Sequence, residues 1–189
     1  MKQKKLRLFG LLLAAAMLLG CLPVQALAAE GGWFYLAADW NGTLLIAPER
    51  VSYTADQTIF EALNASGHSF GPDENSVTQI DGKTGNFIRS DETGSHDLTR
   101  NAAQAGIRYL CFTDRLTAQP SDAMQSLIAA MADYRLEEPD VQLAAQAAYN
   151  AACAGYVAAD DNAALSLYTA LHNAVEQYKQ TLDGPKYNV

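Results

Sequence analysis

The chain has 189 residues, with 13 Lys and Arg against 21 Asp and Glu and a formal net charge of −8 at pH 7. Four of the basic residues and none of the acidic ones lie in residues 1–28, so the rest of the chain carries 9 basic against 21 acidic residues. This excess of acid argues against nucleic acid or anionic lipid as a partner, since both bind to basic patches. The remaining chain, about 160 residues, suffices for one domain with a real core or for two small ones.

The N-terminus predicts export. Basic residues precede an apolar run over residues 8–22, and Ala26-Leu27-Ala28 places small residues at the cleavage positions of a secretory signal. The run is too short to span a bilayer comfortably, which takes about 20 apolar residues. We therefore interpret residues 1–28 as a signal peptide. The protein is expected outside the cell or on its surface, without a transmembrane helix in the mature chain.

The same segment contains a candidate lipidation site at Cys21. Leu18-Leu19-Gly20-Cys21 resembles a bacterial lipoprotein box, in which the cysteine is lipidated and becomes the first residue. Under that interpretation the chain carries a lipid anchor. The Ala-Leu-Ala motif that follows favours an ordinary signal, whose product is released or held through partners.

Residues 29–118 show mostly strand and turn patterns. Strands are expected over residues 33–38, 43–47, 50–54, 77–80, 87–89 and 107–112. Asn41-Gly42 predicts a hairpin, and Pro48 is expected to end the strand after it. Thr58 and Glu61 form a capping-box pair at the start of a helix over residues 58–63. The order predicts an α+β domain with one helix on a small mixed sheet.

Residues 119–183 show helical periodicity. Pro120 and Ser121 mark the start of a first helix, Pro139 opens a second, alanine-rich helix, and Asp160 caps a third. In the third helix, apolar residues spaced four and three apart predict a seam that packs on a partner helix: Ala164, Tyr168, Leu171, Val175, Tyr178 and Leu182. We expect a helical hairpin or a three-helix bundle, followed by a tail over residues 184–189.

Four elements carry a resemblance to a known domain. They are Val51-Ser52-Tyr53-Thr54, the helix over residues 58–63, Val77-Thr78-Gln79-Ile80-Asp81-Gly82, and the strand over residues 107–112. The stretch that they span resembles the β-grasp domain related to the C-terminal domain of transcobalamin, which recurs in surface proteins of gut Firmicutes. The resemblance implies a β-grasp-like sheet, but Asn86-Phe87-Ile88-Arg89 replaces a Trp-hydrophobic-Tyr strand of that domain. No residue here is assigned a corrinoid contact.

The C-terminal helices look like the spacer modules of bacterial cell-wall proteins.

Trp33, Tyr35 and Trp40 are candidate ligand-facing aromatics, because aromatic rings stack on sugars. The alternative is that they pack at the first strand.

Cys111 and Cys153 either form one bridge or are two separately buried thiols, and neither belongs to a CxxC motif.

No metal ligand or catalytic residue is predicted. The three histidines, His68, His96 and His172, lack metal-ligand spacing. The acidic residues of 73–75, 81–82 and 91–92 fit solvated turns better than a calcium site, since the calcium-loop spacing is missing. Gly94-Ser95-His96-Asp97 holds serine, histidine and acid only as neighbours, whereas a triad converges from separate positions.

The sequence thus predicts an exported, non-enzymatic binding or interaction module of a bacterial envelope, without a cofactor. Its partner is an unidentified protein or small molecule. A small-ligand binder for a corrinoid or a glycan is the first alternative, and an unrecognised hydrolase is the second.

Overall fold

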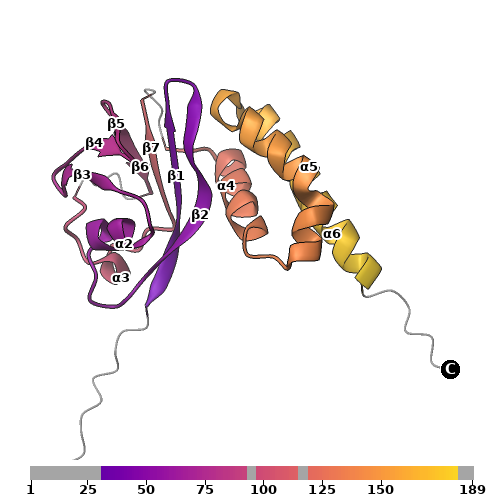
Figure 1. Ribbon diagram of the computed structural model, residues 1–189, viewed down its shortest axis with the longest axis horizontal. Coiled ribbons are helices and arrows are strands. Elements are labelled where there is room, and N and C mark those ends of the chain that lie inside the picture. The colour runs from indigo at the N-terminus through magenta and orange to yellow at the C-terminus, as the bar shows by residue number, and fades with distance from the viewer. Residues whose placement is uncertain (1–30, 93–96, 115–118, 183–189) are drawn as a thin grey trace, which may run out of the picture. The chain divides into compact units, whose positions relative to one another are not determined.

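A mixed four-stranded sheet forms the centre of the computed structural model, which describes residues 31–92, 97–114 and 119–182. The strand order is β2-β1-β7-β6, with β1 (Gly32–Trp40), β2 (Thr43–Tyr53), β6 (Ile88–Asp91) and β7 (Tyr109–Thr113). β1 and β7 run parallel in the middle, and each pairs with an antiparallel edge strand (Figure 1). The predicted α+β class, with a small mixed sheet followed by a C-terminal helical region, is confirmed. The described residues belong to one compact unit.

Some predictions fall outside the described residues. These are the signal peptide over residues 1–28, the lipidation site Cys21, the boundary placed at residue 118 and the tail over residues 184–189.

The hairpin between β1 and β2 turns where the sequence predicts it. Asn41 and Gly42 both have positive φ, at 49° and 73°, as a tight two-residue hairpin turn requires. The prediction that Pro48 ends the strand is wrong, because β2 continues to Tyr53. The register shifts between Leu36 and Ala38 of β1, so that Pro48 falls in a bulge of an edge strand. A proline is tolerated at such a position, because bulges of edge strands interrupt the hydrogen-bond ladder.

One face of the sheet is covered by α2 (Ile59–Ala65), α3 (Ala102–Ala105) and a second sheet. The capping box of α2 is confirmed: Glu61 N donates to Thr58 Oγ1, and Thr58 N donates to Glu61 Oε2. The second sheet has the order β3-β4-β5, with β3 (Phe70–Asp73), β4 (Ser76–Ile80) and β5 (Lys83–Thr84). The sequence patterns missed α3 and β3, because α3 has only four residues and β3 contains Gly71-Pro72.

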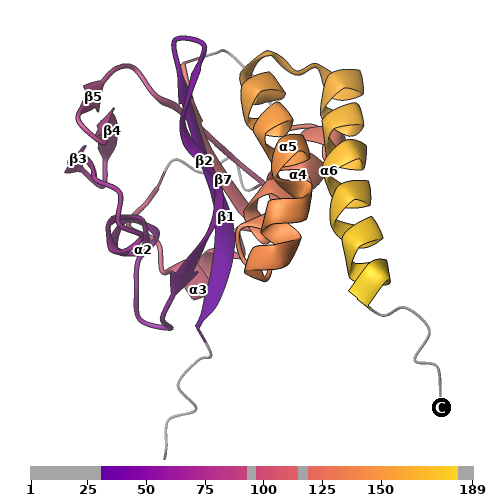
Figure 2. The same cartoon turned by 45° about the vertical axis from the view of Figure 1, so that its right-hand side comes forward.

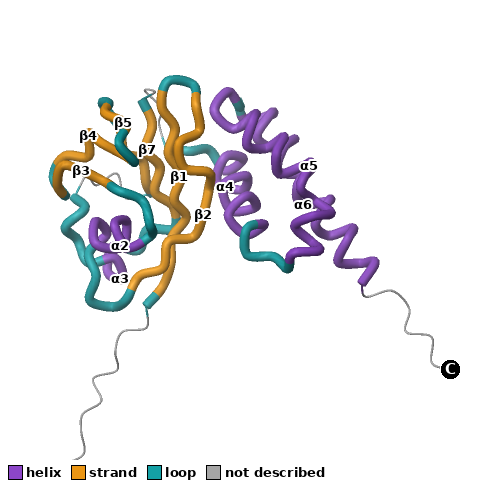
Figure 3. Tube along the Cα trace, viewed as in Figure 1, coloured by secondary structure: helices purple, strands orange, loops and turns teal. Residues whose placement is uncertain are grey.

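The other face is covered by three helices, α4 (Asp122–Tyr134), α5 (Pro139–Gly155) and α6 (Asp161–Leu182), with a short 3-10 turn, η1 (Tyr156–Ala158). Figure 2 shows the three helices together on this side of the sheet, and Figure 3 shows α4 beside β2 with α5 and α6 farther from the sheet. The predicted starts are confirmed: Ser121 and Asp160 accept from the backbone of their first helical turns, and Pro139 is the first residue of α5. α6 packs against both α4 and α5, which makes the layer a three-helix arrangement.

The central strands are buried on both faces. Phe34, Leu36, Leu110 and Phe112 belong to the core beneath α2, whereas Tyr109 and Cys111 belong to the core beneath the three helices. Side chains alternate across a strand, so β1 and β7 supply both cores at once.

The seam of α6 predicts unequal effects for two leucines of the same helix. Leu171 is fully buried and Leu165 is 52% exposed. We expect Leu171→Ala to lower the free energy of unfolding by about 2–5 kcal/mol, through lost burial and a residual cavity. Leu165→Ala, the control, is expected to change it by about 0.5 kcal/mol or less. Urea unfolding measures both, and equal losses would contradict the packing of α6.

Candidate functional site

The three candidate aromatics are divided between the two faces of β1. Trp33 and Tyr35 lie on one side with ring centroids 4.8 Å apart, and the guanidinium carbon of Arg50 lies 4.0 Å from the Trp33 ring centroid. Trp40 belongs to the core on the opposite face, 4.9 Å from Phe87 between ring centroids. The structure therefore brings Trp33 and Tyr35 together and leaves Trp40 apart, and their contact with a ligand stays a prediction.

Asp133 of α4 ties this aromatic pair to the helical layer. Its Oδ1 accepts from Tyr35 Oη at 3.2 Å and lies 2.8 Å from Arg50 Nη2. Burial, reinforced by the neighbouring Asp133 carboxylate, raises the pKa of Tyr35, so the phenol keeps the proton that it donates. Arg50 is thus engaged both by Trp33 and by Asp133, which gives the Trp33 ring a structural partner on one face.

A cleft of about 560 Å³ lies between β2 and α5. Its lining comes from β2 (Leu45, Ile46, Ala47, Glu49), from the loop before β3 (His68), from the end of α4 (Tyr134, Arg135) and from α5 (Gln142, Gln146, Tyr149, Asn150). β2 is an edge strand of the main sheet, so the cleft follows the edge of the sheet. A volume of this size is typical of small-molecule sites.

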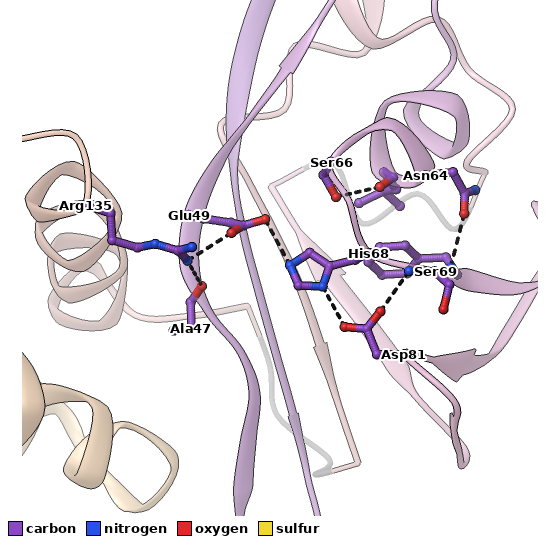
Figure 4. A network of polar contacts seen from close by, with 10 residues as sticks. Ala47, Glu49, Asn64, Ser66, His68, Ser69, Asp81 and Arg135 are labelled. Carbon is purple, nitrogen blue, oxygen red and sulfur yellow. Dashed lines mark hydrogen bonds and ion pairs between the residues drawn. The ribbon is translucent and has the colours of Figure 1, made fainter.

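A chain of charged groups forms one wall of the cleft, and we call it the Glu49–His68 network (Figure 4). Arg135 Nη1 lies 2.9 Å from Glu49 Oε2 and donates to the carbonyl of Ala47. The other oxygen of Glu49 lies 3.2 Å from His68 Nε2. On the far side of the ring, His68 Nδ1 lies 2.6 Å from Asp81 Oδ2. The network joins α4, the edge strand β2 and the turn after β4.

Local backbone structure places Asp81 at the end of this network. Asp81 and Gly82 both have positive φ and make the tight turn between β4 and β5 that the Asp-Gly pair indicates. From this turn, Asp81 Oδ1 accepts from Ser69 N at 2.8 Å. The next backbone N–H, that of Phe70, donates to Asn64 Oδ1. The chain on the C-terminal side of His68 is thereby held by two side chains.

The carboxyl group of Asp81 is stabilised in its charged form. Burial acts to raise its pKa, but hydrogen bonds from Ser69 and from His68 outweigh burial and leave the pKa below its ordinary value. Because the two ring nitrogens of His68 both face carboxylates, the ring donates on both sides only when it carries a proton on each nitrogen.

The opposite wall of the cleft is an amide ladder on α5. Gln142, Gln146 and Asn150 are spaced four residues apart and therefore share one helix face. Gln142 is engaged in the fold, since its side chain donates to the carbonyls of Arg135 and Glu137. Gln146 and Asn150 are exposed. Amide groups both donate and accept hydrogen bonds, so this wall suits a ligand rich in hydroxyl or amide groups.

The geometry of His68 does not resemble that of a hydrolase. In a nucleophilic site, the base faces a hydroxyl or thiol on one side and an acid on the other. His68 instead has a carboxylate on each side. Of the predicted neighbours, Gly94, Ser95 and His96 lie outside the described residues. Asp97 accepts from the backbone and hydroxyl of Thr99 in a turn.

The cysteines are held as free thiols rather than as a bridge. Burial raises the pKa of Cys111 to about 12, which keeps it an unreactive thiol.

His172 stacks on Tyr168, with ring centroids 5.6 Å apart, on the exposed side of α6.

The acidic turns carry local structural roles. Asp73 Oδ1 accepts from the backbone of Asn75 and Ser76, and Asp91 pairs with Arg89. Within the described ranges, no cluster of three or more His, Cys, Asp or Glu side chains is arranged to hold a metal ion.

Sequence patterns identified neither the Glu49–His68 network nor the amide ladder. Glu49, His68, Asp81 and Arg135 are far apart along the chain, and nothing local indicates that they meet. The spacing of Gln142, Gln146 and Asn150 is a usable signal, because it gives the alanine-rich helix one polar face.

Comparisons of the chain with protein-family models, with curated proteins and with solved structures found no match. Among the helices that the structure describes, none is long and apolar enough to cross a membrane.

The Asp81 hydrogen bonds predict a pH-dependent contribution to stability. A lowered folded-state pKa means that the carboxylate stabilises the fold above its ordinary pKa, 3.8, and that this contribution is lost as the pH falls through the folded-state value. Asp81→Asn keeps a residue that tolerates positive φ. The variant should be less stable than the wild type near pH 6, and the gap should close towards about pH 2.

Urea unfolding across this pH range measures the gap, with the exposed Asp56→Asn as control. A gap that stays constant with pH, or that appears equally in the control, would contradict the role of Asp81.

Proposed function

We propose that this protein is an exported, non-enzymatic binding module of a bacterial envelope and that its ligand occupies the cleft between β2 and α5. The observation that carries the proposal is the pairing of a fixed, charged wall with an exposed amide wall across about 560 Å³. The Glu49–His68 network makes one wall rigid, and rigid sites lose little freedom on binding.

The chemistry of the cleft favours a polar ligand of the glycan or short-peptide type. Gln146 and Asn150 offer donors and acceptors, and Tyr149 adds an aromatic surface. Tyr149 is itself supported by Tyr134, with ring centroids 4.3 Å apart. A corrinoid is a further candidate ligand, because residues 51–114 resemble the transcobalamin-related β-grasp domain.

Export and anchoring rest on the N-terminal pattern. We propose that the chain is cleaved after Ala28 and released or held through partners, with a lipid at Cys21 as the alternative. Intact mass spectrometry of the chain recovered from its native host is expected to match residues 29–189. A mass that begins at Cys21 with added acyl chains would overturn release and establish the anchor.

Ligand binding is tested by thermal unfolding of residues 29–189 with calcium, a corrinoid, muropeptides and common glycans. A ligand at about 100 times its dissociation constant adds about 2.7 kcal/mol, which raises the melting temperature by several degrees. We expect a rise with a glycan or a muropeptide. The absence of a rise with every ligand would contradict the proposed small-ligand cleft and favour a role in protein interaction.

Two matched pairs of variants locate the binding site. Gln146→Ala and Asn150→Ala remove exposed amides from the cleft, and Gln177→Ala and Asn173→Ala remove exposed amides from α6. We expect each cleft variant to weaken binding of the identified ligand by roughly three- to tenfold, as for the loss of one hydrogen bond. Equal weakening by the α6 pair would place the site elsewhere.

A further inference from the structure

Arg89 is a buried cation with unused donors. It lies on the edge strand β6, its side chain is only 6% exposed, and Nη2 pairs with Oδ2 of the fully buried Asp91. Its Nε and Nη1 are also buried, and neither has a hydrogen-bond partner among the described residues. A buried polar donor without an acceptor is costly, and the cost is larger for a charged group.

This arginine differs from the other charges of the sheet edges. Arg135 donates to both Glu49 and a carbonyl, and Arg50 pairs with Asp133 beneath a ring. Burial lowers the pKa of Arg89, and Asp91 offsets this only in part. A guanidinium nonetheless keeps its charge in proteins. The fold therefore maintains at β6 a positive group of which only Nη2 has a hydrogen-bond partner among the described residues.

A pocket of about 330 Å³ adjoins Arg89 between the two sheets. One wall comes from residues 74–78, which lead into and include part of β4, and the other from residues 86–89, which lead into β6. Phe87, Leu98 and Phe112 form apolar parts of the lining, and all three are buried. Ser76 and Thr78 are polar residues of the same lining.

We propose that this pocket binds a small organic monocarboxylic acid, whose carboxylate accepts hydrogen bonds from Arg89 and whose apolar part contacts Phe87 and Leu98. Arginine has only donors, so the complementary group is an oxygen acceptor, and a carboxylate makes the stronger, charge-assisted bond. Glu74 in the lining and Asp91 beside Arg89 disfavour a second negative charge.

This site is separate from the cleft of the proposed function. The cleft follows the β2 edge of the main sheet, whereas Arg89 lies on the β6 edge, and the two sites share no lining residue. Binding at Arg89 therefore does not depend on ligand binding in the cleft beside α5.

The test uses two probes that differ only in the acceptor group. N-acetyl-leucine presents a carboxylate, and N-acetyl-leucinamide presents a neutral amide of similar size. Titrations of ¹⁵N-labelled residues 29–189, followed by NMR, report both the affinity and the Arg89 Nε–H resonance. We expect the acid to bind roughly tenfold or more tightly than the amide, as for a charge-assisted bond. We also expect the acid to shift the Arg89 Nε–H resonance.

Arg89→Lys is the diagnostic variant, because it keeps the charge opposite Asp91 while removing the guanidinium donors. The exposed Arg108→Lys is its control, since Arg108 is 78% exposed and pairs only at the surface. We expect Arg89→Lys to abolish the preference for the acid and Arg108→Lys to keep it. Equal binding of the two probes by the wild type, absence of binding, or an unshifted Arg89 resonance would each overturn the proposal.

Discussion

The parallel pairing of β1 and β7 at the centre of the sheet is the constraint on which the rest of the structure depends. A parallel pair in the middle of a sheet has two apolar faces, and both must be covered. Phe34 and Phe112 turn to one face, and Tyr109 and Cys111 turn to the other. The layer with α2 and the layer of α4, α5 and α6 are the two covers. The helical region therefore completes the second core of the sheet as well as packing on itself.

Covering the second face also creates the candidate site. α4 is fixed to the sheet at two points, through Asp133 to Arg50 and through Arg135 to Glu49. With α4 fixed, α5 faces the β2 edge and leaves a cleft between its amide ladder and the strand. The same Glu49 continues to His68, so the contact that docks the helix also fixes the loop before β3. Docking and site formation thus share one set of charged groups.

Local signals in the sequence predicted what local chemistry determines. Asn41-Gly42 and Thr58 with Glu61 place a turn and a helix start because their geometry depends on neighbours in the chain. The prediction that Pro48 ends the strand was wrong because a proline is tolerated in an edge strand. Only the assembled sheet shows that β2 is one. The packing of the second sheet on the main core, the Glu49–His68 network and the pocket at Arg89 arise from tertiary contacts. Of the predicted aromatics, Trp33 and Tyr35 share a face because they are two residues apart on β1. Trp40, an odd number of residues further along the strand, faces the opposite core.

The two edges of the main sheet show how a charge that protects an edge differs from one suited to binding. Exposed edges invite pairing with other chains, and buried or bulging charged segments discourage it. The β2 edge is protected from such pairing by Pro48 and by the ion pair of Arg135 with Glu49. Both charged groups of this pair are neutralised by each other. At β6, Asp91 alone would be enough to neutralise Arg89. The donors left over at Arg89 do nothing for edge protection, and their burial costs stability. The β6 edge thus differs from the β2 edge in holding buried donors without acceptors. A ligand that accepts hydrogen bonds from Arg89 would explain why they are kept.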